Sequence, residues 1–191
     1  MSKLAFKNKL LFLLMCFAVA QHAAFAESID AKFSISDIRS ELKEGVYHLN
    51  ARLDLQLGDE MREALRNGVP LVFVLELEIL EPRFKWLNRE VAHVEQRYEL
   101  RYHALSQQYL LTNLNTGIQS AFHNLTFALS KLSYIENLPL LDADVIEGRD
   151  DVLARLRIRL DVGKLPLPLK IRAYTSQNWY TTSTWVRWAL Q

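Results

Sequence analysis

The feature that most constrains this chain is a strict alternation of apolar and polar residues. Along residues 47–57, tyrosine, leucine and alanine take every second position, and polar residues fill the positions between them. Residues 152–162 repeat the pattern, with three arginines and an aspartate among the intervening residues. Because side chains of a β-strand point alternately to its two faces, both segments predict strands with one buried and one solvated face.

Further alternating or apolar segments predict strands at residues 32–36, 69–80, 91–104, 109–114, 118–122 and 169–174, with the tryptophan-rich C-terminal segment as the closing strand. Apolar residues recur at intervals of three and four in residues 58–68 and 124–136, which predicts two short amphipathic helices. Pro82 is expected to end its strand, and the Asn-Leu-Pro sequence at residues 137–139 to end the second helix. We therefore predict a mainly β protein, an antiparallel β-sandwich or partly open barrel of about eight or nine strands with two helices.

Residues 1–26 have the pattern of a cleavable secretory signal peptide. Three lysines precede an apolar run at residues 10–20, and Ala24 and Ala26 provide small side chains just before Glu27. The run is shorter than the roughly 20 residues that span a bilayer. We expect cleavage after Ala26, one mature domain at residues 27–191 without a transmembrane anchor, and a periplasmic location. Full secretion and anchoring by an uncleaved N-terminal segment are the alternatives.

Removal of this leader changes the charge and cysteine content. The whole chain has a formal net charge of +1, but the leader contains three lysines and no acidic residue, which leaves 20 basic and 22 acidic residues. A mature domain near −2 lacks the basic excess of a nucleic-acid-binding protein, so we predict no nucleic-acid partner. Cys16 is the single cysteine, so the mature domain has no disulfide and no thiolate metal site.

Motifs of known catalytic chemistry are missing from the sequence. It has no nucleophile elbow, zinc-protease helix, dinucleotide-binding glycine pattern or phosphate-binding loop. His93 and His103 share one face of a predicted strand, but ten residues of extended chain separate them by about 33 Å. An acidic loop lacks the residue order of a calcium-binding hand: Asp142, Asp144, Glu147, Asp150 and Asp151. We therefore predict no catalytic residue, no cofactor and no metal site.

Two groups are weak candidates for contact with a ligand or partner. Arg155, Arg157 and Arg159 point outward, and Lys170 and Arg172 are expected beside them across a hairpin, so that five cations on one face would attract an anion. The favoured alternative is cross-strand pairing with the Glu/Arg stripe at residues 95–101.

The second group is the tryptophans of the C-terminal segment. Trp179 and Trp185 lie six positions apart, about 20 Å in an extended strand, which is too far for one glycan-binding platform. Core or edge packing is therefore expected for them and for Trp188, and Trp179 remains the residue to test as a ligand contact.

Several segments in order resemble one bacterial family: NGVPLVFVLELEI, RYHALSQQYLL, SAFHNLTFALSKL and RLRIRLDVGKLPLPLKIRAYTSQNW. The chain resembles the family catalogued as domain of unknown function 4390 over about residues 30–188. It departs from the family's arginine-proline-arginine-tryptophan run at residues 81–84, and Leu167 replaces a usual lysine. The resemblance implies an exported protein of Gram-negative bacteria with no established activity, cofactor or catalytic residue. It also implies a gene beside a membrane sensor kinase.

Three functional hypotheses follow. The first is a non-enzymatic interaction module of the cell envelope with an unidentified envelope partner, for which a membrane sensor is one possibility. The second is a binder of a small ligand or glycan through the tryptophan segment. The third is an unrecognised hydrolase, which would need His93, His103 or His123 beside carboxylates in one cleft.

Overall fold

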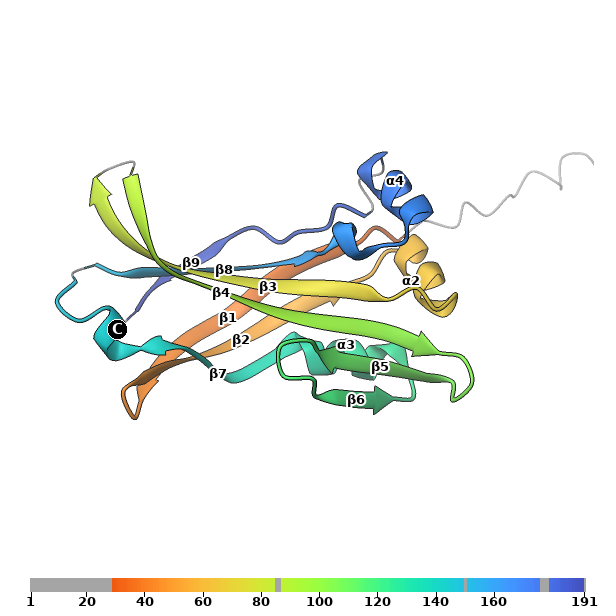
Figure 1. The fold of residues 1–191 in the computed structure, drawn as a ribbon, viewed down its shortest axis with the longest axis horizontal. Coiled ribbons are helices and arrows are strands. Elements are labelled where there is room, and N and C mark those ends of the chain that lie inside the picture. Colours follow the sequence, from red (N-terminus) through yellow and green to blue (C-terminus); the bar gives the residue numbers. More distant parts are fainter. Residues whose placement is uncertain (1–28, 85–86, 150, 176–178, 191) are drawn as a thin grey trace, which may run out of the picture.

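The computed structural model describes residues 29–84, 87–149, 151–175 and 179–190. Within these residues the chain forms nine β-strands, three α-helices and two 3-10 helices. The strands form two antiparallel sheets that pack face to face without closing into a barrel (Figure 1). The predicted mainly β sandwich of eight or nine strands is confirmed. The predicted cleavage site at Ala24, Ala26 and Glu27 lies outside the described residues.

The larger sheet has six strands in the order β6-β5-β4-β3-β8-β9. Their bounds are β3 (Leu71–Phe84), β4 (Leu87–His103), β5 (Gln108–Asn113), β6 (Gln119–Phe122), β8 (Leu153–Leu160) and β9 (Val186–Ala189). β3 lies at the centre, antiparallel to β4 and β8, and every residue from 71 to 80 is buried. The apolar run in its first half is therefore the sign of a strand covered on both faces.

The smaller sheet has the order β1-β2-β7, formed by β1 (Lys32–Lys43), β2 (Val46–Gln56) and β7 (Tyr134–Asp142). Burial alternates along β2 as its sequence predicts, with Leu49 and Leu53 inside. The two sheets meet in one core, where the ring of Phe33 on β1 lies 5.8 Å from that of Phe73 on β3. The core is built from the inward residues of both sheets, as the alternation requires.

Both predicted helices are present. α2 (Asp59–Arg66) buries Met61, Ala64 and Leu65, and α3 (Leu125–Ser133) is capped by Asn124, whose Oδ1 accepts a hydrogen bond from Phe127 N at 2.9 Å. The 3-10 helices are η1 (Ala143–Val145) and η2 (Val162–Lys164). None of the helices in the described ranges is long and apolar enough to cross a membrane.

A third helix, α4 (Leu167–Thr175), replaces the strand predicted at residues 169–174, so that prediction is wrong. Leu169 and Ala173 fit a period of two, but they are also four residues apart and share one side of a helix. Ala173 is fully buried and Leu169 half-buried. Pro168 does not prevent the helix, because it lies in the first turn, where backbone N–H groups have no partner within the helix.

Two prolines also differ from expectation. β3 continues past Pro82 to Phe84, since its pairing with β8 ends at Leu80 and only β4 remains as a neighbour. α3 ends earlier than predicted, at Ser133, and β7 begins at once and contains Pro139. β7 is the edge strand of its sheet, so a proline there does not interrupt a central ladder.

Candidate functional site

A network of paired charges lies on the outer face of the larger sheet, which is the face turned away from the smaller sheet. β3 contributes Glu76 and Glu78 to it, and they are only 4% and 9% exposed. Arg155 Nε on β8 donates a hydrogen bond to Glu78 Oε2 at 2.7 Å. Arg157 and Arg159 each bind one oxygen of Glu76. The three predicted arginines are therefore paired with carboxylates of the neighbouring strand.

The five-cation surface, which was the less favoured of the two interpretations, does not form. Lys170 and Arg172 belong to α4 and not to a strand beside β8, and Arg172 Nε lies 3.6 Å from Glu60 Oε2. Cross-strand pairing was the favoured alternative, but the partner strand differs from the expected stripe at residues 95–101. That stripe lies on β4, one strand farther from β8, because β3 separates them.

Glu76 carries a charge in a largely buried position. Burial alone raises the pKa of its carboxyl group, but hydrogen bonds and charge from Arg159 and Arg157 outweigh burial and hold the pKa below the ordinary 4.5. A carboxylate of lowered pKa favours the folded state where it is ionised, so Glu76 connects the stability of the sheet with pH.

Acid is expected to destabilise the protein in part through Glu76. Well above pH 4.5 the carboxylate is ionised in both folded and unfolded states, and its stabilising contribution is complete. Below that pH the unfolded state takes up the proton first, and the contribution is lost as the pH falls through the lower folded-state pKa. Urea unfolding at neutral and acid pH measures this loss. A Glu76→Gln variant with the same pH dependence as the wild type would contradict it.

Trp185 covers two of the outer-face arginines. The guanidinium carbons of Arg155 and Arg157 each lie 4.4 Å from the centre of its ring. This distance is typical of a cation–π interaction. Trp185 is therefore held above the ion pairs of β8 and β3, at the place where sequence reasoning puts a weak ligand contact.

The other two tryptophans of the segment fasten it to distant elements. Trp179 is 1% exposed, and its Nε1 donates a hydrogen bond to Glu60 Oε2 on α2 at 2.7 Å. Trp188 lies on β9, and its Nε1 donates to Ser40 Oγ on β1 at 3.1 Å. Trp179 thus has almost no surface for a ligand in this conformation, and a contact with one would require its side chain to leave the core.

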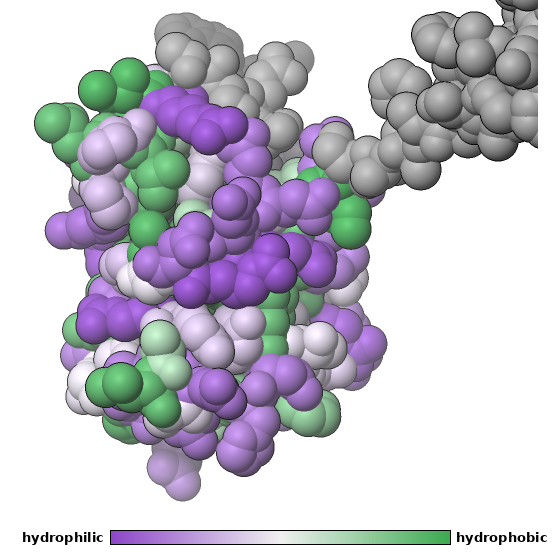
Figure 2. Space-filling model, turned by 90° about the vertical axis from the view of Figure 1, so that its right-hand side faces the viewer, coloured by the Kyte–Doolittle hydropathy of each residue, from purple (hydrophilic) through white to green (hydrophobic). Residues whose placement is uncertain are grey.

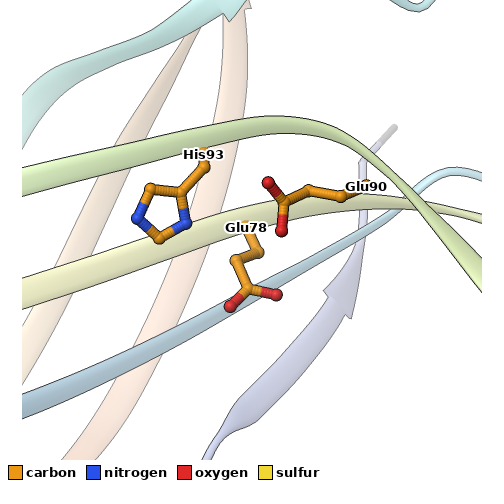
Figure 3. Close-up of side chains that lie close together, drawn as sticks. All are labelled: Glu78, Glu90 and His93. Carbon is orange, nitrogen blue, oxygen red and sulfur yellow. The ribbon is translucent and has the colours of Figure 1, made fainter.

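One group of side chains in the described ranges has the composition of a metal site. Glu78 on β3 and Glu90 and His93 on β4 place one carboxylate oxygen each and a ring nitrogen within 4.8 Å of one another (Figure 3). The group was missed in the sequence because Glu90 and His93 are three residues apart, a spacing that puts side chains on opposite faces of a regular strand.

Among the histidines named for a hydrolase, His93 lies beside carboxylates, those of Glu78, Glu90 and Glu95. His103 lies at the end of β4, where its Nδ1 is 2.9 Å from Ser106 Oγ in an exposed turn. Ser106 N also donates to the same nitrogen at 3.3 Å, so the contact closes the turn. Within the described residues no ion pair joins His103 or His123 to a carboxylate.

A groove of about 550 Å³ opens between the two sheets beside α3. Tyr98 and Leu111 form part of its wall from the larger sheet, and Leu138 and Pro139 from β7. Burial raises the pKa of the Tyr98 hydroxyl, as expected for a phenol in apolar surroundings. The lining of the groove mixes apolar and polar side chains, and we assign no chemistry to it.

A comparison with protein families decides the relationship that the sequence segments indicate. The model of the family described as a domain of unknown function (DUF4390) matches residues 30–189. The chain belongs to this family. No curated protein and no solved structure matches it significantly. The predicted family resemblance is thereby confirmed, and the DUF4390 match covers almost the whole described domain.

The last of the segments that resemble DUF4390, residues 155–179, has structural contacts on both sides of α4. Asp161 Oδ2 accepts a hydrogen bond from Arg97 Nη1 on β4 at 3.0 Å. Leu165 is 5% exposed, and the segment ends at the buried Trp179. α4 lies between these fixed points, so the motif holds this helix on the end of the sandwich.

α4 leaves one apolar side uncovered. Leu167, Ile171 and Tyr174 follow the i, i+4, i+7 spacing of a single helix face and are 70%, 61% and 59% exposed. Tyr180 extends this surface, since its ring lies 6.0 Å from that of Tyr174. Figure 2 shows apolar and charged side chains next to each other at this end of the molecule. We call these four residues the α4 surface.

Proposed function

We propose that this DUF4390 protein is an exported, periplasmic and non-enzymatic interaction module of the cell envelope, and that it binds through the α4 surface. The observation that carries the proposal is the exposed apolar stripe of α4. Burial of one leucine or isoleucine side chain stabilises a protein by about 1.5–3 kcal/mol. α4 exposes Leu167, Ile171 and Tyr174 to water on one face, which is the property of an interaction site.

The α4 surface is held in place from behind. Ala173 packs inward, and Glu60 on α2 receives the Trp179 indole N–H at 2.7 Å and lies near Arg172. Because the buried side of α4 is fixed to the sandwich, the exposed side chains are presented without folding of the helix at the moment of binding. Such preorganisation reduces the entropy lost on association.

The charges around the α4 surface favour an anionic membrane surface as the partner. Lys164 is exposed just before α4, and Lys170 and Arg172 lie on the helix itself. A short helix with apolar side chains on one side and cations around them is the pattern of a segment that lies in the lipid headgroup region. Basic side chains there gain about 1 kcal/mol each near anionic lipids.

The start of the described domain lies at the same end. Asp59 N on α2 donates to the carbonyl of Ile29 at 3.2 Å, and Ile29 N donates to Asp59 Oδ2 at 3.0 Å (Figure 1). If the predicted leader stayed uncleaved, its apolar run would therefore hold this end, with α4, near the bilayer. The position of α4 is therefore compatible with membrane binding whether the leader is removed or retained.

Flotation with lipid vesicles tests the proposal. Protein isolated from the periplasmic fraction is expected to float with phosphatidylethanolamine–phosphatidylglycerol vesicles and not with phosphatidylcholine vesicles. Ile171→Glu should weaken vesicle binding by about tenfold or more, because it replaces an apolar side chain in the contact with a negative charge that the anionic lipids repel. Leu42→Glu is the matched control, since Leu42 is 51% exposed near the end of β1 and lies away from α4.

The outcomes separate the parts of the proposal. Equal flotation of the wild type and Ile171→Glu would overturn the role of α4. Absence of flotation together with Ile171-dependent capture of an envelope protein, for example the periplasmic region of a membrane sensor, would keep the interaction module and replace lipid by protein. A cytoplasmic location on cell fractionation would overturn export.

A further inference from the structure

We propose that Glu78, Glu90 and His93 bind one divalent transition-metal ion, with Zn²⁺ as the reference ion. The site lies on the outer face of β3 and β4 and is independent of α4. Glu78 comes from the centre of the sheet and is 9% exposed, whereas Glu90 and His93 are exposed to solvent. A metal ion would thus be held between a buried carboxylate and two accessible ligands (Figure 3).

A β-bulge builds this arrangement. Glu78 pairs with His93 and Ile79 with Ala92, but the next residue of β3, Leu80, pairs with Glu90. Val91 is therefore the extra residue on β4. One extra residue reverses the parity of the strand, so Glu90 turns to the same face as His93 in place of the opposite one. Without the bulge β4 would offer one ligand at this point, and with it β4 offers two.

The imidazole of His93 also lies near a further carboxylate, at slightly more than hydrogen-bond distance. Its Nε2 lies 3.6 Å from Glu95 Oε1, and Figure 3 shows one ring nitrogen turned toward the carboxylates of Glu78 and Glu90 and the other turned away. Nδ1 is thus the nitrogen directed at the ion. A metal-bound histidine commonly donates its other N–H to a carboxylate, which fixes the tautomer and the ring orientation.

Glu78 is also oriented and keeps one oxygen available. Arg155 donates from both Nε and Nη2 to the same oxygen, Oε2. Within the described residues no hydrogen bond or ion pair involves Glu78 Oε1, which leaves that oxygen for a metal. Arg155 also offsets part of the repulsion between the carboxylates of Glu78 and Glu90, so the two can lie close together in the metal-free protein.

The donor set decides the class of ion. One imidazole and two carboxylates are ligands for Zn²⁺ and related first-row ions, which accept nitrogen and oxygen donors and can complete their coordination with water. Ca²⁺ requires about six to eight oxygen ligands, and three protein side chains with one nitrogen do not provide them.

Isothermal titration of untagged wild-type protein with ZnCl₂ at neutral pH is expected to show one ion per chain. His93→Ala should weaken binding at least about tenfold, and Glu95→Gln about tenfold through loss of the orienting contact. His103→Ala is the matched control, because His103 lies on the same strand but its ring bonds to Ser106, away from Glu78 and Glu90. The zinc affinity of this variant should equal that of the wild type. Circular dichroism confirms that each variant is folded.

Nitrogen-15 NMR of the histidine rings gives a readout that a structural role cannot imitate. Zn²⁺ should shift Nδ1 of His93 and leave the rings of the other histidines unchanged. No stoichiometric binding, equal affinity of His93→Ala and wild type, or coordination through Nε2 would each overturn the assignment. Since α4 is not involved, vesicle flotation of His93→Ala should match the wild type, and either proposal can fail without the other.

Discussion

Replacement of Trp179 with alanine is expected to lower the free energy of unfolding by about 3–5 kcal/mol, the range for a buried large aromatic residue. Trp179 is 1% exposed and is among the largest fully buried side chains of the described domain. Its removal opens a cavity between the C-terminal segment and α2 and leaves Glu60 Oε2 without the indole donor. Urea denaturation followed by circular dichroism measures the change.

Two further variants make this result specific. Trp179→Phe retains most of the apolar volume and removes the indole N–H, so it should cost clearly less than alanine. Tyr180→Ala is the neighbouring control, because Tyr180 is 61% exposed and its loss should change stability by about 0.5 kcal/mol or less. A loss below about 1 kcal/mol for Trp179→Ala would show that the indole does not hold the segment to the core.

The second large effect is expected from Glu76→Gln, which should lower the free energy of unfolding by about 2–3 kcal/mol. The amide has nearly the same shape, but it cannot neutralise Arg157 and Arg159, which both bind Glu76. Removal of one member of a fully buried ion pair costs about 3–5 kcal/mol. The two arginines are 34% and 29% exposed, so water recovers part of their solvation and the expected loss is smaller.

A charge pair at the rim of the same face supplies the comparison. Arg101 Nη2 lies 2.6 Å from Glu99 Oε1, but Arg101 is 51% exposed, so Glu99→Gln should cost no more than about 1 kcal/mol. Chemical denaturation at neutral pH measures the stability loss of each variant relative to the wild type. Similar losses for Glu76→Gln and Glu99→Gln would mean that burial of Glu76 does not increase the contribution of its ion pairs to stability.

The arginines of these ion pairs also shield apolar residues on the outer face of the larger sheet from water. Val72 and Val74 point to that face and are buried. Val74 lies between Arg97 and Arg159 in the register of the three central strands. Long arginine side chains cover apolar surface with their methylene groups while their charged ends reach acidic partners or water. The outer face therefore needs no helical layer over these residues.

Much of the fold could be predicted from local pattern. The alternation at residues 47–57 and 152–162 became β2 and β8, and the helical spacing after Gly58 became α2. Residues 169–174 form a helix where the local pattern predicts a strand. The spacing of four between Leu169 and Ala173 is compatible with one face of a strand and with one face of a helix. The segment is too short for its periodicity to distinguish the two.

The candidate sites depended on contacts that no local pattern contains. The outward direction of Arg155, Arg157 and Arg159 followed from parity alone, but their partners followed from the placement of β3 next to β8. Glu90 joined His93 only because the pairing of β3 and β4 shifts by one residue at Val91. A register shift is set by two strands together, and neither strand encodes it alone.

The sequence by itself determined the membership in DUF4390, which rests on a match over residues 30–189. It also determined the mainly β architecture and the division of most strands into inner and outer faces, because apolar and polar residues alternate at short intervals along the chain. Tertiary structure decided which element covers Trp179, that α4 exposes Leu167 and Ile171, and that the side chains of Glu78, Glu90 and His93 converge. The physical reason is that burial, register and charge pairing are properties of surfaces brought together by folding, over separations far longer than any periodic pattern.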